Sequence, residues 1–272
     1  RAEYGRIRAL AETAGTTALV APRLAPDPET MPPTRFGERL DDWATHLQTP
    51  AESARVVGVH AHLHGYASAD RSAALRECMR LIDLLVEAGH SPEFIDIGGG
   101  VPMRYLEHEQ QWRDYQDAIA TQRDGYATPF TWKSDPLTST YPYWQEPTRG
   151  TWLEQVLADG VAEGLRDRGL RLHLEPGRSL LDGCGVILAR VAFVKTRSDG
   201  LPLVGLEMNR TQCRTTSDDY LTDPILVKRT EDSDEVEAFL VGAYCIEDEL
   251  ILRRKIRFPN GVAAGDIVAI PN

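Results

Sequence analysis

The chain changes character once along its length, from alternating strands and helices to strands alone. Four short apolar runs in the first part have the character of strands: 18–24, 55–63, 94–97 and 171–174. Segments with the apolar spacing of helices lie between them, and repeated strand–helix–strand order predicts a parallel sheet. After about residue 183 only β-branched segments and turns follow. We therefore expect an α/β domain over 1–182 and an all-β barrel or sandwich domain over 183–272.

The expected helices are those in which apolar residues recur at three or four positions: 38–47, 72–88 and 152–168. Gly89 and Gly169 are expected to end the last two. The expected strands of the β domain are 186–195, 203–207, 225–228, 236–243, 249–257 and 266–270.

The number of parallel strands limits the architecture of the first domain. Four are expected, whereas a closed (β/α)₈ barrel needs eight strands and typically about 250 residues. The sheet is therefore either open or the later part of such a barrel. Between about 103 and 150 the periodicity is lost and aromatic residues are frequent. We interpret this stretch as an ordered insertion, because aromatic side chains bury large areas; a partly disordered loop is the alternative.

Charge and cysteine content exclude several classes of protein. The formal net charge is −11 at pH 7, which argues against a nucleic-acid partner. No apolar run approaches the roughly 20 residues of a membrane-spanning helix, and no signal peptide is visible at the start. The 4 cysteines are scattered, without the spacing of a zinc site or a disulfide scaffold. We expect a cytoplasmic protein with no membrane partner.

Two motifs follow directly on parallel strands. Gly98, Gly99 and Gly100 come after the run at 94–97, where residues without a Cβ let backbone N–H groups surround a phosphate. A tight turn is the alternative. Glu175, Pro176, Gly177 and Arg178 come after the run at 171–174 and offer a carboxylate, a backbone donor and a cation. A surface ion pair with a turn explains this second motif equally well.

Histidines and one cysteine complete the candidate site residues. His60, His62 and His64 share one face of a strand, because side chains alternate. They suit metal ligation, stacking on a planar cofactor, or hydrogen bonding within a core. Cys245 precedes the acids Glu247, Asp248 and Glu249; a small buried hydrophobic residue is the alternative reading of this cysteine.

Taken in order, six motifs resemble those of the ornithine, diaminopimelate and arginine decarboxylases, fold-type III pyridoxal-phosphate enzymes with an alanine racemase-like barrel. They are Arg35-Phe36-Gly37, Gly58-Val59-His60-Ala61-His62-Leu63, Ile95-Asp96-Ile97-Gly98-Gly99-Gly100, Glu175-Pro176-Gly177-Arg178-Ser179-Leu180, Met208-Asn209 and Gly242-Ala243-Tyr244-Cys245. The resemblance spans almost the whole chain. It implies a pyridoxal-phosphate-binding (β/α)₈ barrel, of which only the later part is present, followed by an incomplete β domain.

The resemblance also implies roles for individual residues. His62 would stack on the pyridoxal ring, and Glu175 would face its pyridine nitrogen. The phosphate would be held by Gly65, Gly98, Gly99, Gly100, Gly177 and Arg178. Cys245 would act in the active site of a partner subunit, which implies a homodimer, and Glu249 or Asp248 would meet the substrate amine. No metal is expected.

Several positions depart from the family pattern. None of Lys133, Lys195, Lys228 and Lys255 has the setting of the lysine that binds the cofactor covalently, so we expect that lysine, like the family's phosphate-contacting tyrosine, outside this chain. Gly65 stands where the family often has a phosphate-binding serine, and His64 where it has a glycine. Ile246 replaces an acid that contacts substrate in diaminopimelate decarboxylases.

These observations predict a pyridoxal-phosphate-dependent decarboxylase acting on an α-amino acid, basic or diamino in character. Arg210 and Arg214, beside Met208-Asn209, are candidates for binding the substrate carboxylate, with an exposed salt bridge as the alternative. Two other functions stay open. One is a non-catalytic homologue acting as a regulator, and the other is a metal-dependent barrel hydrolase that uses His60 and His62.

Overall fold

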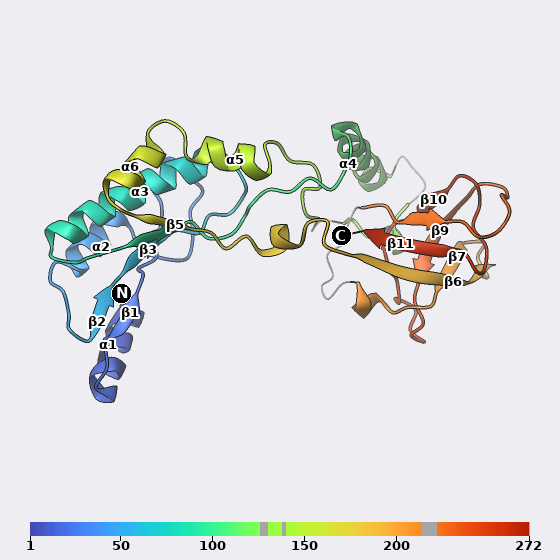
Figure 1. The fold of residues 1–272 in the computed structure, drawn as a ribbon. Coiled ribbons are helices and arrows are strands. Elements are labelled where there is room, and N and C mark those ends of the chain that lie inside the picture. The colour runs from blue at the N-terminus through green and yellow to red at the C-terminus, as the bar shows by residue number, and fades with distance from the viewer. Residues whose placement is uncertain (126–129, 138–139, 214–221, 272) are drawn as a thin grey trace. The chain divides into compact units, whose positions relative to one another are not determined.

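The computed structural model describes residues 1–125, 130–137, 140–213 and 222–271 (Figure 1). The chain divides into two compact units. The first consists of Arg1–Pro102 and Glu146–Leu180, and the second of Met103–Gln145 and Leu181–Asn272. Each unit has its own hydrophobic core, so each is described by itself.

Parallel strands form the centre of the first unit. β1 (Ala18–Val20) pairs with β2 (Ala54–Val56), and β3 (Gly58–His60), β4 (Phe94–Asp96) and β5 (Arg171–His173) form a sheet in the order β3-β4-β5. Past β1, Arg23 bridges to His60 in a parallel sense. Strands are present in all four expected runs, but the run at 55–63 forms two short strands, β2 and β3, which belong to different sheets. The segments that follow β3, β4 and β5 therefore begin side by side at one edge of the sheet. The site described below lies at this edge.

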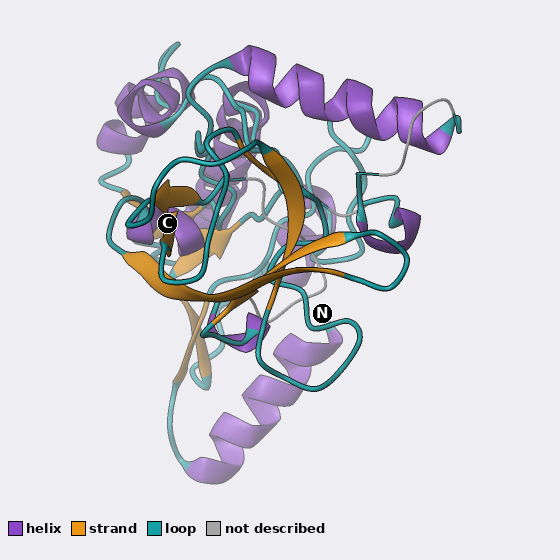
Figure 2. Ribbon diagram, turned by 90° about the vertical axis from the view of Figure 1, so that its right-hand side faces the viewer, coloured by secondary structure: helices purple, strands orange, loops and turns teal. Residues whose placement is uncertain are grey.

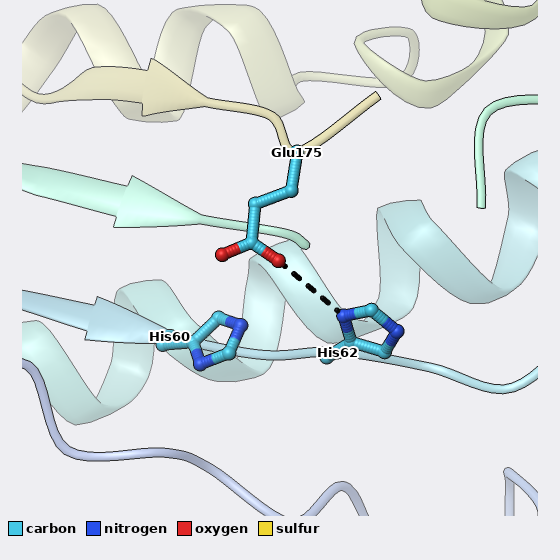
Figure 3. Close-up of side chains that lie close together, drawn as sticks. All are labelled: His60, His62 and Glu175. Atoms are coloured by element: carbon cyan, nitrogen blue, oxygen red, sulfur yellow. Dashed lines mark ion pairs between the residues drawn. The ribbon is translucent and has the colours of Figure 1, made fainter. Parts of the chain in front are cut away.

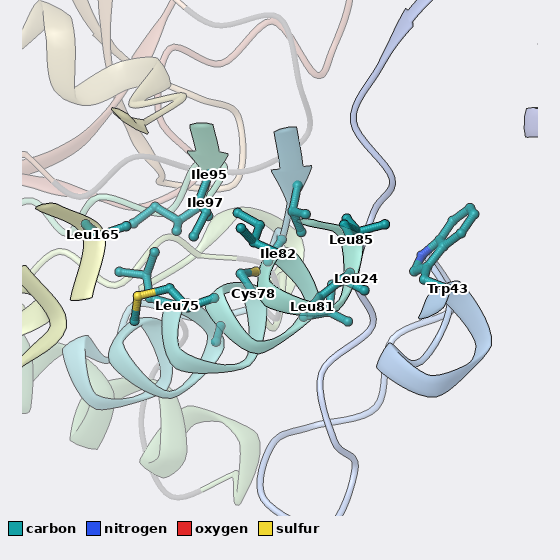
Figure 4. Packing of buried hydrophobic residues seen from close by; sticks show 14 of the residues in the cluster. Leu24, Trp43, Leu75, Cys78, Leu81, Ile82, Leu85, Ile95, Ile97 and Leu165 are labelled. Atoms are coloured by element: carbon teal, nitrogen blue, oxygen red, sulfur yellow. The ribbon is translucent and has the colours of Figure 1, made fainter. Parts of the chain in front are cut away.

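Helices pack on this sheet through the apolar stripe of α3 (Ser68–Glu87). Leu75, Leu81 and Leu85 on α3 are 0%, 0% and 1% exposed, and the same core includes Ile95 and Ile97 (Figure 4). The other helices are α1 (Ala2–Ala14), α2 (Leu40–His46), α5 (Arg149–Val156) and α6 (Val161–Asp167). The sequence missed α1, whose side chains are mostly exposed and lack a strong apolar stripe.

The single helix expected at 152–168 was wrong. The structure has two helices there, because Asp159 and Gly160 have φ angles of 51° and 81° between α5 and α6. A left-handed backbone cannot continue an α-helix. Since Gly160 has no Cβ, it adopts this conformation at little cost.

The second unit is built on a six-stranded sheet in the order β10-β9-β7-β6-β11-β8. Its neighbouring strands are antiparallel except for β9 and β7, which are parallel. In Figure 2, where this unit faces the viewer, the strands are strongly curved. The strands are β6 (Val186–Thr196), β7 (Pro202–Leu206), β8 (Ile225–Val227), β9 (Val236–Val241), β10 (Ile256–Phe258) and β11 (Ile267–Pro271).

The strand expected at 249–257 is mostly absent, since only its end forms β10. Leu250, Ile251 and Leu252 are all buried at consecutive positions, which a strand with alternating faces does not allow for one core. The backbone of the following residues is engaged elsewhere: Trp132 N–H donates to Arg253 O at 2.7 Å.

The structure groups the aromatic-rich insertion with the second unit rather than with the α/β part. It contains the helix α4 (Glu109–Arg123), which the sequence did not indicate because only Ile119 and Gln122 are buried on it. The insertion joins the β unit where Trp132 packs edge-on against Phe239, with ring centroids 5.2 Å apart. An ordered insertion is therefore what the described residues show.

Among the residues that the structure describes, no helix combines the length and the apolar character needed to cross a membrane.

Candidate functional site

Three strand ends of the first unit bring the predicted residues together. His60 ends β3 and His62 follows it, Gly98–Gly100 follow β4, and Glu175 follows β5. Figure 3 shows Glu175 reaching from the end of β5 toward His62, with His60 beside them. The carboxyl edge of a parallel sheet is where α/β proteins bind ligands. The arrangement therefore follows from the sheet order rather than from any single motif.

The glycine turn has a conformation that other residues would strain. Gly98 and Gly100 have φ angles of 67° and 82°. A Cβ at Gly98 would collide with the ring of His62, and one at Gly99 would lie 3.0 Å from the carbonyl oxygen of Glu175. Gly98 N–H donates to Asp96 Oδ1 at 2.8 Å, which fixes the start of the turn. The absence of side chains at Gly98 and Gly99 thus lets the turn lie against His62 and Glu175.

Hydrogen bonds donated by backbone N–H groups connect the three strand ends. Glu175 N–H donates to Gly98 O at 3.0 Å, and Gly99 N–H donates to His62 Nδ1 at 3.3 Å. The Glu175 carboxylate lies 3.6 Å from His62 Nδ1, with both side chains about half exposed. An imidazole and a carboxylate therefore lie beside the glycine turn.

His60 lies deeper than its neighbours. Burial lowers the pKa of His60, and the charges of Asp96 and Glu175 only partly oppose this, so the ring is neutral at pH 7. Its Nε2 has no hydrogen-bond partner within the described part of the chain. Nitrogen and oxygen atoms of His60, His62 and Glu175 lie within 4.8 Å of one another, a grouping that is also compatible with a metal ion.

One residue that the sequence did not indicate lies beneath the glycine turn. Arg71, in the first turn of α3, is 0% exposed and donates from Nη2 to Gly65 O at 2.8 Å and to Gly99 O at 3.1 Å. Burial lowers the pKa of Arg71, although Asp70 and Tyr66 oppose this. A Cβ at Gly100 would collide with the Arg71 guanidinium and lie 2.9 Å from Gly65 O.

The remaining predicted phosphate-contacting residues border the same region. Gly65 has a φ of 95° and follows the histidine strand. Gly177 and Arg178 begin the 3₁₀ turn η2 (Gly177–Leu181), and both are exposed. Ser179 Oγ donates to Pro176 O at 2.8 Å and fixes the start of this turn.

A side cavity of about 350 Å³ opens beside His62. Arg23 donates from Nη2 to His62 O at 3.0 Å and also lies over the ring of Phe36, 4.7 Å from its centroid. His64 lines this cavity too, together with His62, whereas the grouping within 4.8 Å consists of His60, His62 and Glu175. The cavity gives the site room beyond the glycine turn.

The cysteine motif lies in the second unit. Cys245 and Ile246 are exposed, and Asp248 Oδ1 accepts hydrogen bonds from Lys133 Nζ and Trp132 Nε1, each at 2.8 Å. These two donors, Lys133 first, lower the pKa of Asp248. The insertion and the cysteine motif together line a cavity of about 600 Å³. Trp132 and Lys133, both in the insertion, are thus the hydrogen-bond partners of Asp248. We expected Asp248 to be one of the acids that meet the substrate amine.

Glu249 is engaged as well, by the residue next to Met208-Asn209. Its side chain is 3% exposed, Oε1 accepts from Arg210 N–H at 2.8 Å, and Oε2 lies 3.5 Å from Arg210 Nε. Arg210 therefore holds Glu249 rather than standing free for a substrate carboxylate. Arg214, the other candidate for that role, lies outside the described residues.

The chain thus belongs to the α/β proteins that carry a candidate ligand site at the carboxyl ends of parallel strands. In this chain the site consists of a glycine turn, an imidazole and a carboxylate.

Residues 29–135 match the family described as "Pyridoxal-dependent decarboxylase, pyridoxal binding domain". The uncharacterized protein y4yA of Sinorhizobium fredii is 32% identical over 253 residues, covering 88% of this chain and 53% of the relative. Diaminopimelate decarboxylase of Neisseria meningitidis serogroup B is 26% identical over 258 residues, covering 89% and 52%.

Solved structures show a similar fold. Diaminopimelate decarboxylase from Methanocaldococcus jannaschii superposes with a TM-score of 0.68 at 21% identity, covering 99% of this chain and 57% of that one. Arginine decarboxylase of Paramecium bursaria Chlorella virus gives a TM-score of 0.61 at 18% identity, covering 99% and 63%. The chain is thus similar to pyridoxal-dependent decarboxylases of the arginine and diaminopimelate group in part of its sequence and in its fold. It spans about half the length of the curated relatives that it matches.

Proposed function

We propose that this chain is part of a pyridoxal-phosphate-dependent decarboxylase that acts on an α-amino acid. The observation that carries the proposal is the convergence of Gly98–Gly100, His62 and Glu175 at neighbouring strand ends. We further propose that the parallel strands are the later part of a (β/α)₈ barrel, as the resemblance to the barrel decarboxylases implies.

The residues present fit this cofactor. A Cβ at Gly98 would collide with the His62 ring, so glycine at this position lets the imidazole lie against the turn that would hold the phosphate. Gly98, Gly99, Gly100 and Gly65, with Gly177 and Arg178, would hold the phosphate. His62 would lie against the ring, and Glu175 would face the pyridine nitrogen and favour its protonated form. When bound, pyridoxal phosphate supplies an electron sink for the charge left by loss of CO₂.

The substrate that we propose is a basic or diamino acid, such as ornithine, lysine, arginine or diaminopimelate. The names of the relatives and the acids of the cysteine motif support it. Because Lys133 occupies Asp248 Oδ1, a substrate amine would have to replace the ammonium group of Lys133 or use the other carboxylate oxygen. We also propose a cytoplasmic homodimer in which Cys245 serves the site of the partner subunit.

A panel assay tests the proposal on the natural protein that contains this chain. The purified protein should absorb in the visible range through its cofactor and release CO₂ from at least one of ornithine, lysine, arginine, diaminopimelate or a carboxylated polyamine. The Glu175→Gln variant should lose most of this activity while still binding the cofactor. A colourless protein that pyridoxal phosphate does not reconstitute would overturn the proposal.

The grouping of His60, His62 and Glu175 favours one alternative, a metal-dependent hydrolase. Metal analysis of the purified protein distinguishes the two functions. One equivalent of tightly bound zinc, lost in the His60→Asn variant, would favour the hydrolase. A coloured protein without metal but also without CO₂ release would instead fit the non-catalytic homologue.

A further inference from the structure

The buried guanidinium of Arg71 has no carboxylate partner. Nη2 donates to the carbonyl oxygens of Gly65 and Gly99 and lies 3.5 Å from that of Leu63, whereas Nε and Nη1 have no partner anywhere in the described residues. An ionised group in the protein interior is costly unless opposite charge or hydrogen bonds compensate it. Three carbonyl groups around a single nitrogen provide only part of this compensation. The setting of Arg71 therefore points to a missing anion.

The position of Arg71 in its helix adds to this cost. α3 runs from Ser68 to Glu87, so Arg71 lies in the first turn. The N-terminal end of a helix carries partial positive charge and favours anions over cations. A buried cation at this end is retained against two electrostatic penalties. Negative charge bound near Arg71 would relieve both.

The hydrogen bonds of Arg71 also orient the glycine turn. In a trans peptide the C=O and the following N–H point in opposite directions. Because Arg71 holds Gly99 O from below, the N–H of Gly100 points away from the guanidinium. The N–H groups of Gly98 and Gly99 are already used by Asp96 and His62. Gly100 N–H is thus the one donor of the turn without an acceptor in the described part of the chain.

We infer that Arg71 is a positioning residue for the phosphate group of the ligand, aiming Gly100 N–H at it and supplying positive charge beneath the glycine turn. The inference rests on the proposed function, since it assumes a phosphorylated ligand at Gly98–Gly100. A hydroxyl side chain at position 65 could donate a hydrogen bond to the phosphate, but Gly65 has no side chain. Arg71, on α3, would take over part of this role. Selectivity for a phosphorylated ligand over its unphosphorylated form should therefore depend on Arg71.

Binding of pyridoxine 5′-phosphate and of pyridoxine tests this role. Neither alcohol forms an imine with lysine, so calorimetric titration reports non-covalent binding alone. The variants are made in the natural protein that contains this chain, freed of its cofactor, and the wild type should bind the phosphorylated compound more tightly. Arg71→Gln should reduce the ratio of the two Kd values about tenfold or more, with little change in the Kd of pyridoxine. Arg71→Lys keeps the positive charge but lacks the planar, forked N–H donors of the guanidinium. Its ratio of the two Kd values should therefore lie between those of the wild type and Arg71→Gln.

Arg76→Gln is the matched control. Arg76 lies on the same helix, is exposed, and donates to Asp159 O at 3.2 Å, away from the glycine turn, so its ratio should equal that of the wild type. If circular dichroism shows that Arg71→Gln does not fold, Arg71→Lys decides the question. Wild-type ratios in the folded Arg71 variants would overturn the role of Arg71 alone. Failure of the wild-type natural protein that contains this chain to bind either compound would overturn the proposed function together with it.

Discussion

Replacing Gly100 by alanine tests whether the glycine turn and Arg71 form one unit. Two costs are expected. A φ of 82° strains any residue with a Cβ by about 1–2 kcal/mol. In addition, the new Cβ would collide with the Arg71 guanidinium, and loss of one hydrogen bond from this charged group costs roughly 1.5–3 kcal/mol. Together these predict a decrease of about 3–5 kcal/mol in the free energy of unfolding.

Gly169→Ala separates the two costs. Gly169 has a φ of 64° in the same unit, and a Cβ there would meet nothing within 4 Å. The free energy of unfolding of Gly169→Ala should therefore decrease only by the backbone strain, about 1–2 kcal/mol. Urea unfolding followed by circular dichroism measures both variants, with the slope of the transition as a check on two-state behaviour. Equal destabilisation of the two variants would refute the close packing of Arg71 beneath Gly100.

Three further predictions concern the cores and the pH dependence. Leu75→Ala, at a position with 0% exposure, should lower the free energy of unfolding by about 2–5 kcal/mol in the same urea experiment. Trp132→Ala should release the insertion from Phe239 and make 103–145 cleavable by limited proteolysis; unchanged protection would contradict the packing described. Burial opposes ionisation of Asp266, but hydrogen bonds from Arg229, Ala263 and Thr230 outweigh it and lower the pKa. A lowered folded-state pKa stabilises the fold above the unfolded value of about 3.9, and this contribution is lost as the pH falls through the folded-state pKa. Asp266→Asn should therefore be less stable than the wild type at pH 7 and lose less stability on acidification; parallel thermal melting curves against pH would contradict this.

The sequence predicted the centre of the site because that centre depends on strand order. Parallel strands place their carboxyl ends at one edge, so Gly98–Gly100 and Glu175 had to lie near each other once both were assigned to strand ends. The histidine row was predicted less completely. Alternation ends with β3 at His60, and His64 instead lines the side cavity. Periodicity identifies a face only as far as the strand continues.

The partners of the cysteine motif could not be predicted in the same way. Lys133 and Asp248 are 115 positions apart, and their pairing depends on where an irregular insertion folds back. Nothing in the composition of the insertion distinguishes packing on the β unit from packing on the α/β unit, since aromatic side chains suit either surface. The contact nevertheless changes the chemistry of the acid, because one oxygen of Asp248 already has two donors.

The burial of Arg71 could not be predicted from the sequence, for a different reason. At the start of an amphipathic helix, an arginine is expected on the exposed face, where solvent would screen its conflict with the helix dipole. The glycine turn removes that option, because Gly65 and Gly99 direct their carbonyl groups toward the interior and leave no side chain between them and the helix. The carbonyl groups need a donor, and a buried donor with a charge in turn needs an anion. In the role proposed for Arg71, its guanidinium supplies the donor that these carbonyl groups need, and a bound phosphate group would supply the negative charge that the buried guanidinium needs.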